Sequence, residues 1–238
     1  MQENSLVFDA LILAGGRSSR LGGVPKQSLV FAGQTLLERS IAAAAGARRT
    51  VIVGDSGGLQ YSGAVLSAET GHPGVLTCRE EPPFAGPAAA IAAGLDTLEA
   101  HGGGAPYTLV LACDMPLAAK AVAVLRNALS RSAPSLRAGA GGGVMARAED
   151  GRAQPLAAFY GTGELKKACA ELAARDALVN GSVRALLASL DVQLVTVPAG
   201  STSDVDTWDD AAALGIAAGS QRGSKDPNAG GANVGGIS

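Results

Sequence analysis

Residues 13–26 read Leu13-Ala-Gly-Gly-Arg-Ser-Ser-Arg-Leu-Gly-Gly-Val-Pro-Lys26 and follow directly on the apolar run Ala10-Leu-Ile-Leu13. The apolar run predicts a buried strand, and the first glycine pair lets the backbone adopt conformations closed to residues with a Cβ. A strand that opens into a glycine-rich loop exposes backbone N–H groups, which suit phosphate oxygens. Arg17, Arg20 and Lys26 add positive charge that would neutralise a triphosphate. The stretch therefore predicts a nucleoside triphosphate site at the amino end of an α/β domain.

The composition limits the possible partners and the kind of core. The 238 residues are enough for one large domain or two small ones. With 47% apolar but only 3% aromatic residues, the core has to be built mainly from Ala, Val and Leu. The net charge of −2 provides no global basic field. We therefore expect neither nucleic acid nor an anionic membrane as a partner.

Cysteines and histidines are few and scattered. Cys78, Cys113 and Cys169 show no Cys-x-x-Cys spacing, which argues against a disulfide framework or a four-thiolate zinc site and fits a reducing cytoplasm. His72 and His101 are too few for a histidine-rich metal centre. The amino terminus lacks the positive region of a secretory signal, and no apolar run reaches membrane-spanning length. We expect a soluble, cytoplasmic protein.

Strand patterns alternate with helical patterns along the chain. This alternation predicts an α/β fold: a Rossmann-like three-layer α/β/α sandwich with a mainly parallel sheet covered on both faces. Ligands bind such sheets beyond the carboxyl ends of the strands, where the glycine loop and Asp114 would lie. Thr35 and Glu38 form a predicted capping box. The expected strands are 10–13, 28–31, 50–53, 74–78, 107–112, 143–146, 154–160 and 192–197, and the expected helices 36–45, 88–99, 117–129, 163–175, 182–190 and 208–214.

Two common phosphate-binding motifs are absent. A P-loop needs Gly-x-x-x-x-Gly-Lys-Ser/Thr, and no Gly-Lys pair occurs in the chain. The dinucleotide fingerprint Gly-x-Gly-x-x-Gly is also missing from the first turn. A glycine pair after a strand is by itself equally compatible with simple turn geometry, but the cations that follow it favour anion binding.

The loop resembles that of the nucleotidyltransferase superfamily, in which Leu-Ala-Gly-Gly-x-x-x-Arg-Met-Gly-x-x-Lys cradles the nucleotide. Leu21 stands where that pattern has Met, a volume-conserving change. Within the superfamily the chain most resembles the molybdenum cofactor guanylyltransferases, through five separated stretches between residues 8 and 216. The resemblance implies a nucleotide-diphospho-sugar transferase type of fold over residues 1–217. Residues 218–238, rich in Gly and Ser, are expected to form a disordered tail.

Two further stretches extend the resemblance to the base and the metal. The family's Gly-Pro-Leu-Ala-Gly is matched by Gly86-Pro-Ala-Ala-Ala90, and an acidic residue before it contacts guanine in the family. Glu80 is the best candidate, with Arg79 and Glu81 left open, and a solvated charge cluster is the alternative. Asp114, in an Asp-x-Pro at the end of the strongest strand, matches the family's metal ligand. It would otherwise only cap the following helix.

The last two stretches lie in the second half of the chain. Gln154-Pro155 matches the family segment that shapes the second-substrate pocket, although a proline that begins a strand explains it equally well. Asp206 lies in a segment that matches one near the metal in the family, with Trp208 in place of the usual proline. Arg184 resembles a basic position for the pterin phosphate, although any surface arginine would look the same.

The resemblance implies that GTP and Mo-molybdopterin react to give the guanine dinucleotide form of the cofactor and pyrophosphate. It implies Mg²⁺ as cofactor, and transient contact with molybdoenzymes or cofactor-insertion proteins. A cytidylyltransferase acting on molybdopterin or an isoprenoid phosphate, and a non-catalytic nucleotide-binding or cofactor-binding protein, stay open as alternatives. The expected residues are Arg20, Lys26 and Asp114 for catalysis; Leu13, Ala14, Gly15, Gly16, Arg20, Lys26, Glu80, Gly86 and Asp114 for the nucleotide; Asp114 and Asp206 for the metal; and Gln154, Pro155 and Arg184 for the second substrate.

Overall fold

The computed structural model describes residues 6–16, 19–54, 75–131 and 142–216. Arg17 and the predicted tail, residues 218–238, lie outside these ranges. The strands are β1 (Phe8–Leu13), β2 (Val30–Phe31), β3 (Gln34–Thr35), β4 (Thr50–Val53), β5 (Val75–Cys78), β6 (Tyr107–Ala112), β7 (Gly143–Arg147), β8 (Ala153–Gly161) and β9 (Val192–Thr196). The helices are α1 (Leu36–Ala43), α3 (Pro87–Ala100), α4 (Ala118–Arg131), α6 (Thr162–Ala173), α7 (Val183–Leu186) and α8 (Trp208–Ala213), with 3₁₀ turns at Ser19–Leu21 and Lys26–Ser28.

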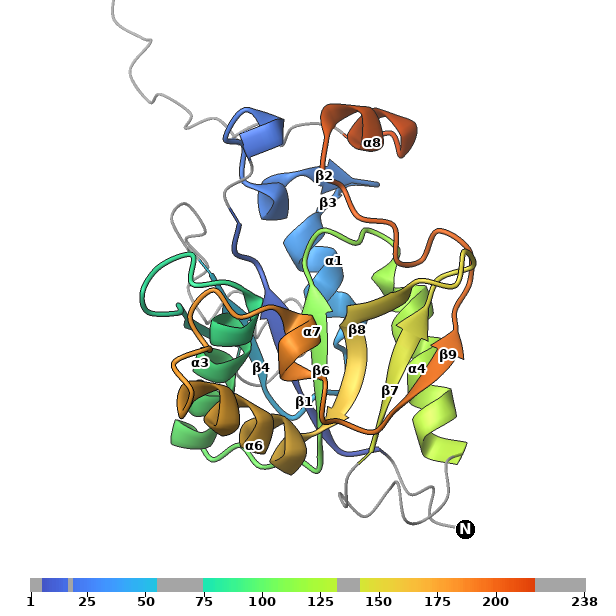
Figure 1. The fold of residues 1–238 in the computed structure, drawn as a ribbon. Helices are drawn as coiled ribbons and strands as arrows, with labels where there is room; N and C mark the ends of the chain where they lie inside the picture. Colours follow the sequence, from blue (N-terminus) through green and yellow to red (C-terminus); the bar gives the residue numbers. More distant parts are fainter. Residues whose placement is uncertain (1–5, 17–18, 55–74, 132–141, 217–238) are drawn as a thin grey trace, which may run out of the picture.

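One seven-stranded sheet, in the order β5-β4-β1-β6-β8-β7-β9, forms the central layer (Figure 1). The pairs β4–β5, β1–β4, β1–β6 and β7–β9 are parallel, and β8 runs antiparallel to both of its neighbours. The predicted mainly parallel sheet is therefore confirmed. Leu13 at the end of β1 pairs in register with Ala112 at the end of β6. The loops that follow these two strands consequently leave the sheet side by side.

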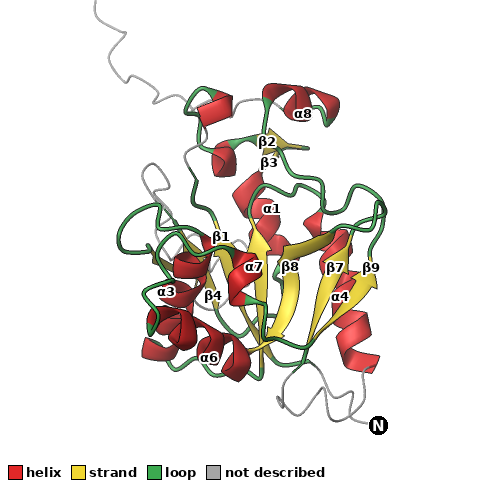
Figure 2. Cartoon of the chain, in the orientation of Figure 1, coloured by secondary structure: helices red, strands yellow, loops and turns green. Residues whose placement is uncertain are grey.

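Helices cover both faces of the sheet, as Figure 2 shows. Phe8, Ala10 and Ile12 of β1 belong to a buried cluster with α1 and α4, whereas Leu11 and Leu13 belong to a second cluster with α3, α6 and α7. Because successive side chains of a strand point to opposite faces, a central strand of a three-layer sandwich is mostly apolar. This explains the apolar run Ala10–Leu13 that leads into the glycine-rich loop, with Asp9 as the buried polar exception in β1.

A small upper unit lies beyond the carboxyl end of the sheet (Figure 1). It contains the β2–β3 hairpin, the turn Ser19–Leu21 and α8 around a third apolar cluster, whose buried members are Leu21, Leu29, Leu36, Val205, Ala211 and Ile216. The unit brings Leu21, Leu29 and Leu36 together with Val205, Ala211 and Ile216 of the last described segment. It therefore holds distant parts of the sequence over the end of β1.

Two predicted elements differ from the structure. The strand expected over 28–31 is the two-residue strand β2 of the separate hairpin, because the bulk of that apolar segment packs into the upper unit. The helix expected over 182–190 is the single turn α7, capped by the Ser182 side chain. The capping box of Thr35 and Glu38 is confirmed. Among the described residues, no helix is both long and apolar enough to cross a bilayer.

Candidate active site

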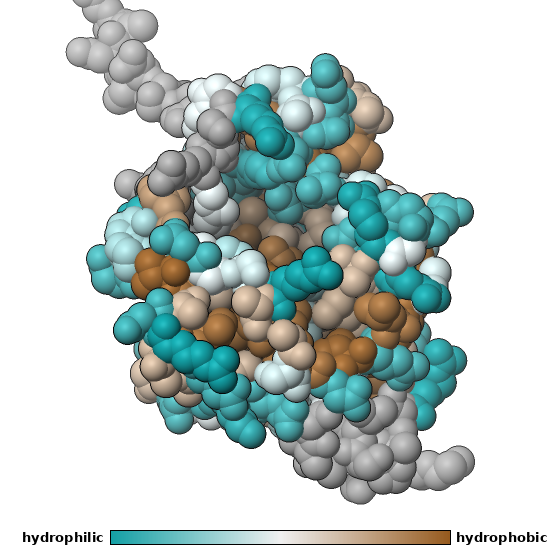
Figure 3. Space-filling view, viewed as in Figure 1, coloured by the Kyte–Doolittle hydropathy of each residue, from teal (hydrophilic) through white to brown (hydrophobic). Residues whose placement is uncertain are grey.

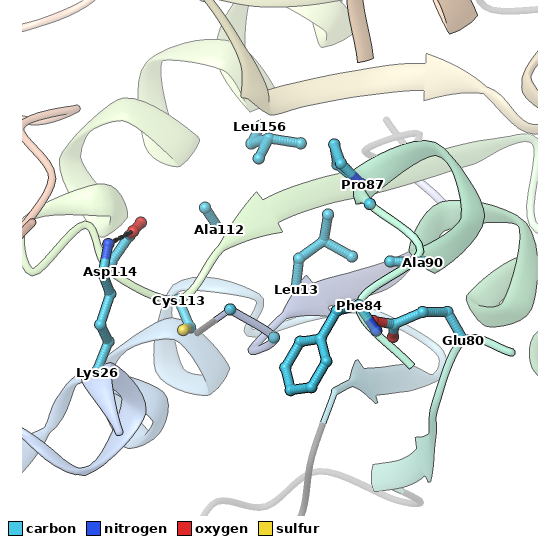
Figure 4. A pocket seen from close by; sticks show the side chains of 13 residues that line it. Leu13, Lys26, Glu80, Phe84, Pro87, Ala90, Ala112, Cys113, Asp114 and Leu156 are labelled. Atoms are coloured by element: carbon cyan, nitrogen blue, oxygen red, sulfur yellow. Dashed lines mark hydrogen bonds and ion pairs between the residues drawn. The ribbon is translucent and has the colours of Figure 1, made fainter. Parts of the chain in front are cut away.

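A cavity of about 310 Å³ opens at the carboxyl ends of β1 and β6. Figure 3 shows this face of the molecule hollowed beneath the upper unit, with apolar residues at the floor of the hollow. Seven residues that the sequence assigned to the nucleotide line it together, namely Leu13, Gly15, Gly16, Lys26, Glu80, Gly86 and Asp114. Figure 4 shows Leu13 of β1 between the Lys26–Asp114 pair on one side and Glu80 on the other.

The glycine loop is held close to the end of β4. The N–H of Ala14, which is buried and does not line the cavity, donates to Val53 O at 2.8 Å. A Cβ on Gly54, where φ is +148°, would lie 2.7 Å from Gly15 N. Glycine is therefore required at position 54 for the loop to approach this closely. Within the described part of the chain, the amides of Gly15 and Gly16 have no acceptor, so they are available to an anion in the cavity.

Lys26 lies between two carboxylates at the edge of the cavity. Its Nζ donates to Asp114 Oδ2 at 2.9 Å and also contacts Asp206 Oδ1. Burial by itself lowers the pKa of Lys26, but the two carboxylates outweigh burial and raise that pKa above its ordinary value. Burial raises the pKa of Asp114, against the opposing charge of Lys26. The two carboxylates thus favour the charged form of the Lys26 ammonium between them.

Asp206 reaches this position through its neighbour in the sequence. The Val205 N–H donates to Asp114 O at 3.0 Å, and the Val205 side chain is fully buried in the cluster of the upper unit. Immediately afterwards, Thr207 and Asp210 form a capping box that starts α8. Backbone pairing on one side and the helix cap on the other fix the carboxylate of Asp206 opposite Lys26.

Arg20 lies at the periphery. Its guanidinium Nη1 is 3.9 Å from Asp206 Oδ2, its side chain is 74% exposed, and it does not line the cavity. An exposed ion pair of this kind adds little to stability. The position leaves the guanidinium free to approach a ligand that extends out of the cavity toward the upper unit.

Glu80 is the acidic residue that faces the cavity. It is 6% exposed, whereas Arg79 and Glu81 are exposed. Its Oε1 accepts from the Phe84 N–H at 3.0 Å, and its buried Oε2 has no hydrogen-bond partner among the described residues. An unsatisfied buried carboxylate oxygen is costly. Because Glu80 also lines the cavity, its carboxylate is an acceptor suited to the N–H groups of a ligand.

Gly86 and Pro87 place the start of α3 at the wall of the first cavity. Gly86 has φ +92°, and Pro87 is the first residue of the helix, where its missing N–H costs nothing. A Cβ on Gly86 would lie 3.4 Å from Gly181 O. The Gly-Pro pair therefore fits both the turn and the neighbouring segment.

A second cavity of about 290 Å³ adjoins the first and contains Gln154 and Pro155. The two cavities share Ala112, Asp114 and Leu156, so Asp114 lies at their junction. The Tyr160 hydroxyl donates to Pro155 O at 2.7 Å and braces this segment. Arg184 is exposed on α7 and lines neither cavity, and its role toward a second substrate stays a prediction.

Several lining residues were not predicted from the sequence. Phe84 lines the first cavity, and Asp204 and Thr202 line the second. Phe84 had a signal, because it is the one large apolar side chain in the loop of residues 79–86. Leu156 follows Gln154 and Pro155 in the segment that the resemblance links to the second-substrate pocket, and it lines both cavities. Cys113, also at the first cavity, is buried, and burial raises the pKa of its thiol, which does not suit a nucleophile.

Solved structures share this architecture. The 2-C-methyl-D-erythritol 4-phosphate cytidylyltransferase from Francisella tularensis is 14% identical, with a TM-score of 0.63 over 88% of this chain and 98% of that one. The protein of that name from Thermus thermophilus is 19% identical, with a TM-score of 0.58 over 87% and 97%. The inositol-1-phosphate CTP transferase from T. maritima is 15% identical, with a TM-score of 0.60 over 86% and 91%. At these identities the likeness shows the fold alone.

Family membership rests on the sequence. No curated protein matches the chain. The family model described as the MobA-like NTP transferase domain matches residues 10–196, well over half of the chain. The matched range contains the glycine loop, Glu80 and Asp114, which together line the cavity. The chain therefore belongs to the MobA-like NTP transferase domains, a family of nucleotidyltransferases.

Proposed function

We propose that the protein transfers GMP from GTP to the phosphate of Mo-molybdopterin and releases pyrophosphate. The observation that carries this proposal is Glu80, which lines the same cavity as the glycine loop and Asp114 and whose buried Oε2 has no partner among the described residues. A nucleotide whose phosphates meet the loop would have its base directed toward this carboxylate.

The chemistry of the base edge favours guanine. Guanine presents two adjacent donors, N1–H and the 2-amino group, and an ionised carboxylate only accepts. Oε2 of Glu80 is therefore complementary to that edge, while Oε1 stays occupied by the Phe84 N–H. Uracil offers a single N–H between two carbonyl oxygens, which a carboxylate repels. Cytosine offers one amino group beside an acceptor nitrogen and would gain fewer hydrogen bonds.

The reaction needs positioning and charge neutralisation rather than a general base. An oxygen of the acceptor phosphate, already an anion, attacks the α-phosphorus in line. The bond from that phosphorus to the bridging oxygen breaks, and pyrophosphate leaves with the electron pair. The amides of Gly15 and Gly16 and the ammonium of Lys26 bind the departing phosphates and stabilise their growing charge. Arg20 would meet the same phosphates from outside.

The carboxylates suit a divalent cation. Mg²⁺ is commonly held by one or two carboxylates together with substrate phosphates. Asp114 and Asp206 already share one cation, the Lys26 ammonium, and the described residues contain no group of three metal-ligating side chains that would hold a metal alone. These two carboxylates would hold the ion. When bound, it would offset charge on the α- and β-phosphate oxygens.

The acceptor is assigned to the second cavity. Gln154 and Pro155 line it, and it meets the first cavity at Asp114. A phosphate at this junction would face the α-phosphorus of a nucleotide in the first cavity. Molybdopterin is proposed as the acceptor because of the MobA-like family and because its pterin has the hydrogen-bonding groups that a cavity with Gln154, Thr202 and Asp204 can bind.

Cytidylyl transfer is the second candidate. The solved structures named above act on CTP according to their names, and the amino group of cytosine also suits Glu80 Oε2. A direct comparison separates the candidates. The full chain is incubated with Mg²⁺, molybdopterin and each of GTP, CTP, ATP and UTP, and pyrophosphate is measured. The proposal requires GTP to give the highest kcat/KM. A preference for CTP assigns cytidylyl transfer instead, and no release with any nucleotide refutes catalysis.

The Asp114→Ala variant tests the metal role within the same assay. We expect pyrophosphate release to fall at least 100-fold, an order-of-magnitude figure for lost transition-state stabilisation. Asp209→Ala, at an exposed position on α8, serves as the matched control and should retain wild-type release. A wild-type rate in Asp114→Ala would refute the metal role.

A further inference from the structure

Phe84 is an exposed aromatic side chain at the nucleotide cavity. It is 42% exposed, and among the large apolar residues of the described chain that are similarly exposed, it alone lines this cavity. Figure 4 shows its ring beside Glu80 and facing the space below Leu13. The backbone at Phe84 has φ +61°, a left-handed conformation that a residue with a Cβ rarely adopts. Strained residues of this kind concentrate at functional sites.

The position of the ring is fixed by its own loop. The Phe84 N–H donates to the buried Glu80 Oε1 at 3.0 Å, and the Ala85 N–H donates to Pro82 O at 3.2 Å. The Asn180 N–H donates to Ala85 O at 2.6 Å and fastens the loop to the segment before α7. The turn that carries the Phe84 ring is therefore held in place by three hydrogen bonds.

A cation lies over the ring. The guanidinium carbon of Arg79 is 5.6 Å from the ring centroid, within the range of a cation–π contact. Arg79 does not line the cavity, so the cavity meets the parts of the ring that the guanidinium leaves uncovered. The Phe84 side chain thus contacts the Arg79 guanidinium and also lines the cavity.

We propose that Phe84 is the base-stacking residue of this site and favours a purine nucleotide. The inference rests on the guanylyl-transfer function proposed above. Glu80 and Phe84 are joined by a hydrogen bond, so one turn offers both a hydrogen-bond acceptor for the edge of a base and an aromatic surface for its face. The Glu80 contact with the edge of the base selects its pattern of hydrogen-bond donors. The stacking contact with Phe84 becomes stronger as the area of the base increases, and a purine has the larger area. Base–aromatic stacking contributes substantially to nucleotide affinity in proteins.

The Phe84→Leu variant removes the aromatic face and keeps an apolar side chain. We expect the Kd of Mg·GTP to rise about tenfold, within the range measured for lost base stacking. The kcat at saturating GTP should stay within about twofold, because the ring touches no reacting atom, and the increase for Mg·CTP should be smaller than for Mg·GTP. Phe84→Tyr should restore wild-type affinity. Val179→Ala, which shortens another exposed apolar residue next to Asn180, is the matched control.

Binding of inorganic tripolyphosphate separates stacking from damage to the fold. Tripolyphosphate uses the glycine loop and Lys26 but has no base, so its affinity should be the same in wild type and Phe84→Leu. An equal loss for tripolyphosphate and GTP would assign Phe84 a structural role and overturn the inference. A Kd for GTP within twofold of wild type would overturn it as well.

Failure of the guanylyl-transfer proposal has a different signature. If wild type binds and uses CTP in preference to GTP, the proposed function fails. If the affinity for CTP then still depends on Phe84, the stacking contact stands but the purine preference does not. If GTP is the preferred substrate and Phe84→Leu binds it normally, the proposed function stands and the stacking inference fails.

Discussion

Glu80 provides the sharpest test of base recognition, through the Glu80→Gln variant. Glu80 is 6% exposed, its Oε1 accepts from the Phe84 N–H, and its Oε2 has no partner in the part of the chain that the structure describes. Glutamine has the same shape. Its amide oxygen can keep the bond to Phe84, which turns the amide NH₂ toward the cavity. The substitution therefore replaces the acceptor that faces the base with a donor and leaves the loop in place.

The magnitude follows from the hydrogen bonds that are lost. A hydrogen bond to a charged group contributes about 1.5–3 kcal/mol, so kcat/KM for GTP should fall roughly 10- to 150-fold. Xanthosine triphosphate, which has a carbonyl oxygen where guanine has its amino group, should become the better substrate, because the glutamine NH₂ donates to that oxygen. The midpoint of thermal unfolding should not fall, since the variant keeps the shape of a buried side chain whose Oε2 has no partner among the described residues.

The assay is pyrophosphate release at subsaturating GTP and xanthosine triphosphate, together with thermal unfolding. Glu81→Gln makes the same chemical change one residue later, at an exposed position, and should behave as wild type. If Glu80→Gln keeps its kcat/KM for GTP within twofold, or if Glu81→Gln loses as much, Glu80 does not contact the base and the reasoning is refuted.

Three further variants or reactions test other parts of the site. In Gly54→Ala, the new Cβ would lie 2.7 Å from Gly15 N and displace the glycine loop, so KM for the nucleotide should rise about 10- to 100-fold. An unchanged KM in steady-state kinetics would contradict this, and Gly163→Ala, at an exposed position with open space around its Cβ, is the control. Lys26→Met leaves two carboxylates without their cation, so stability to urea should fall by about 1–3 kcal/mol and recover when Mg²⁺ is added; full stability without Mg²⁺ would argue against the ion pair. Burial raises the pKa of the Cys169 thiol to about 12, so at pH 8 only about one in 10⁴ molecules carries the thiolate, and alkylation of the folded protein at this residue should be far slower than in urea, as mass spectrometry would measure.

Local patterns predicted most of the fold because they record which residues are buried. The apolar runs Ala10–Leu13 in β1 and Leu109–Ala112 in β6 identified strands covered on both faces, and Thr35 with Glu38 identified the start of α1. The prediction was weakest where a segment packs against a distant one. The short apolar run before α1 belongs to the upper unit, and its cluster includes Val205 and Ile216 from the other end of the domain. No local pattern contains that pairing.

The candidate site divides in the same way. By itself, the sequence identified the candidate groups. The glycine loop with Lys26 and the carboxylate Asp114 at the end of its strand follow from residue types at short spacing, and the acidic group before Gly86 follows from the family resemblance. The tertiary structure decided which groups meet. Burial selected Glu80 over Arg79 and Glu81, since only its carboxylate lies in the cavity. Asp206 contacts Lys26 from 180 residues away because Val205 pairs with the backbone of Asp114 and packs into the upper unit. Such contacts depend on the packing of the whole domain, whereas the loop and the strand that opens it depend on their neighbours in sequence.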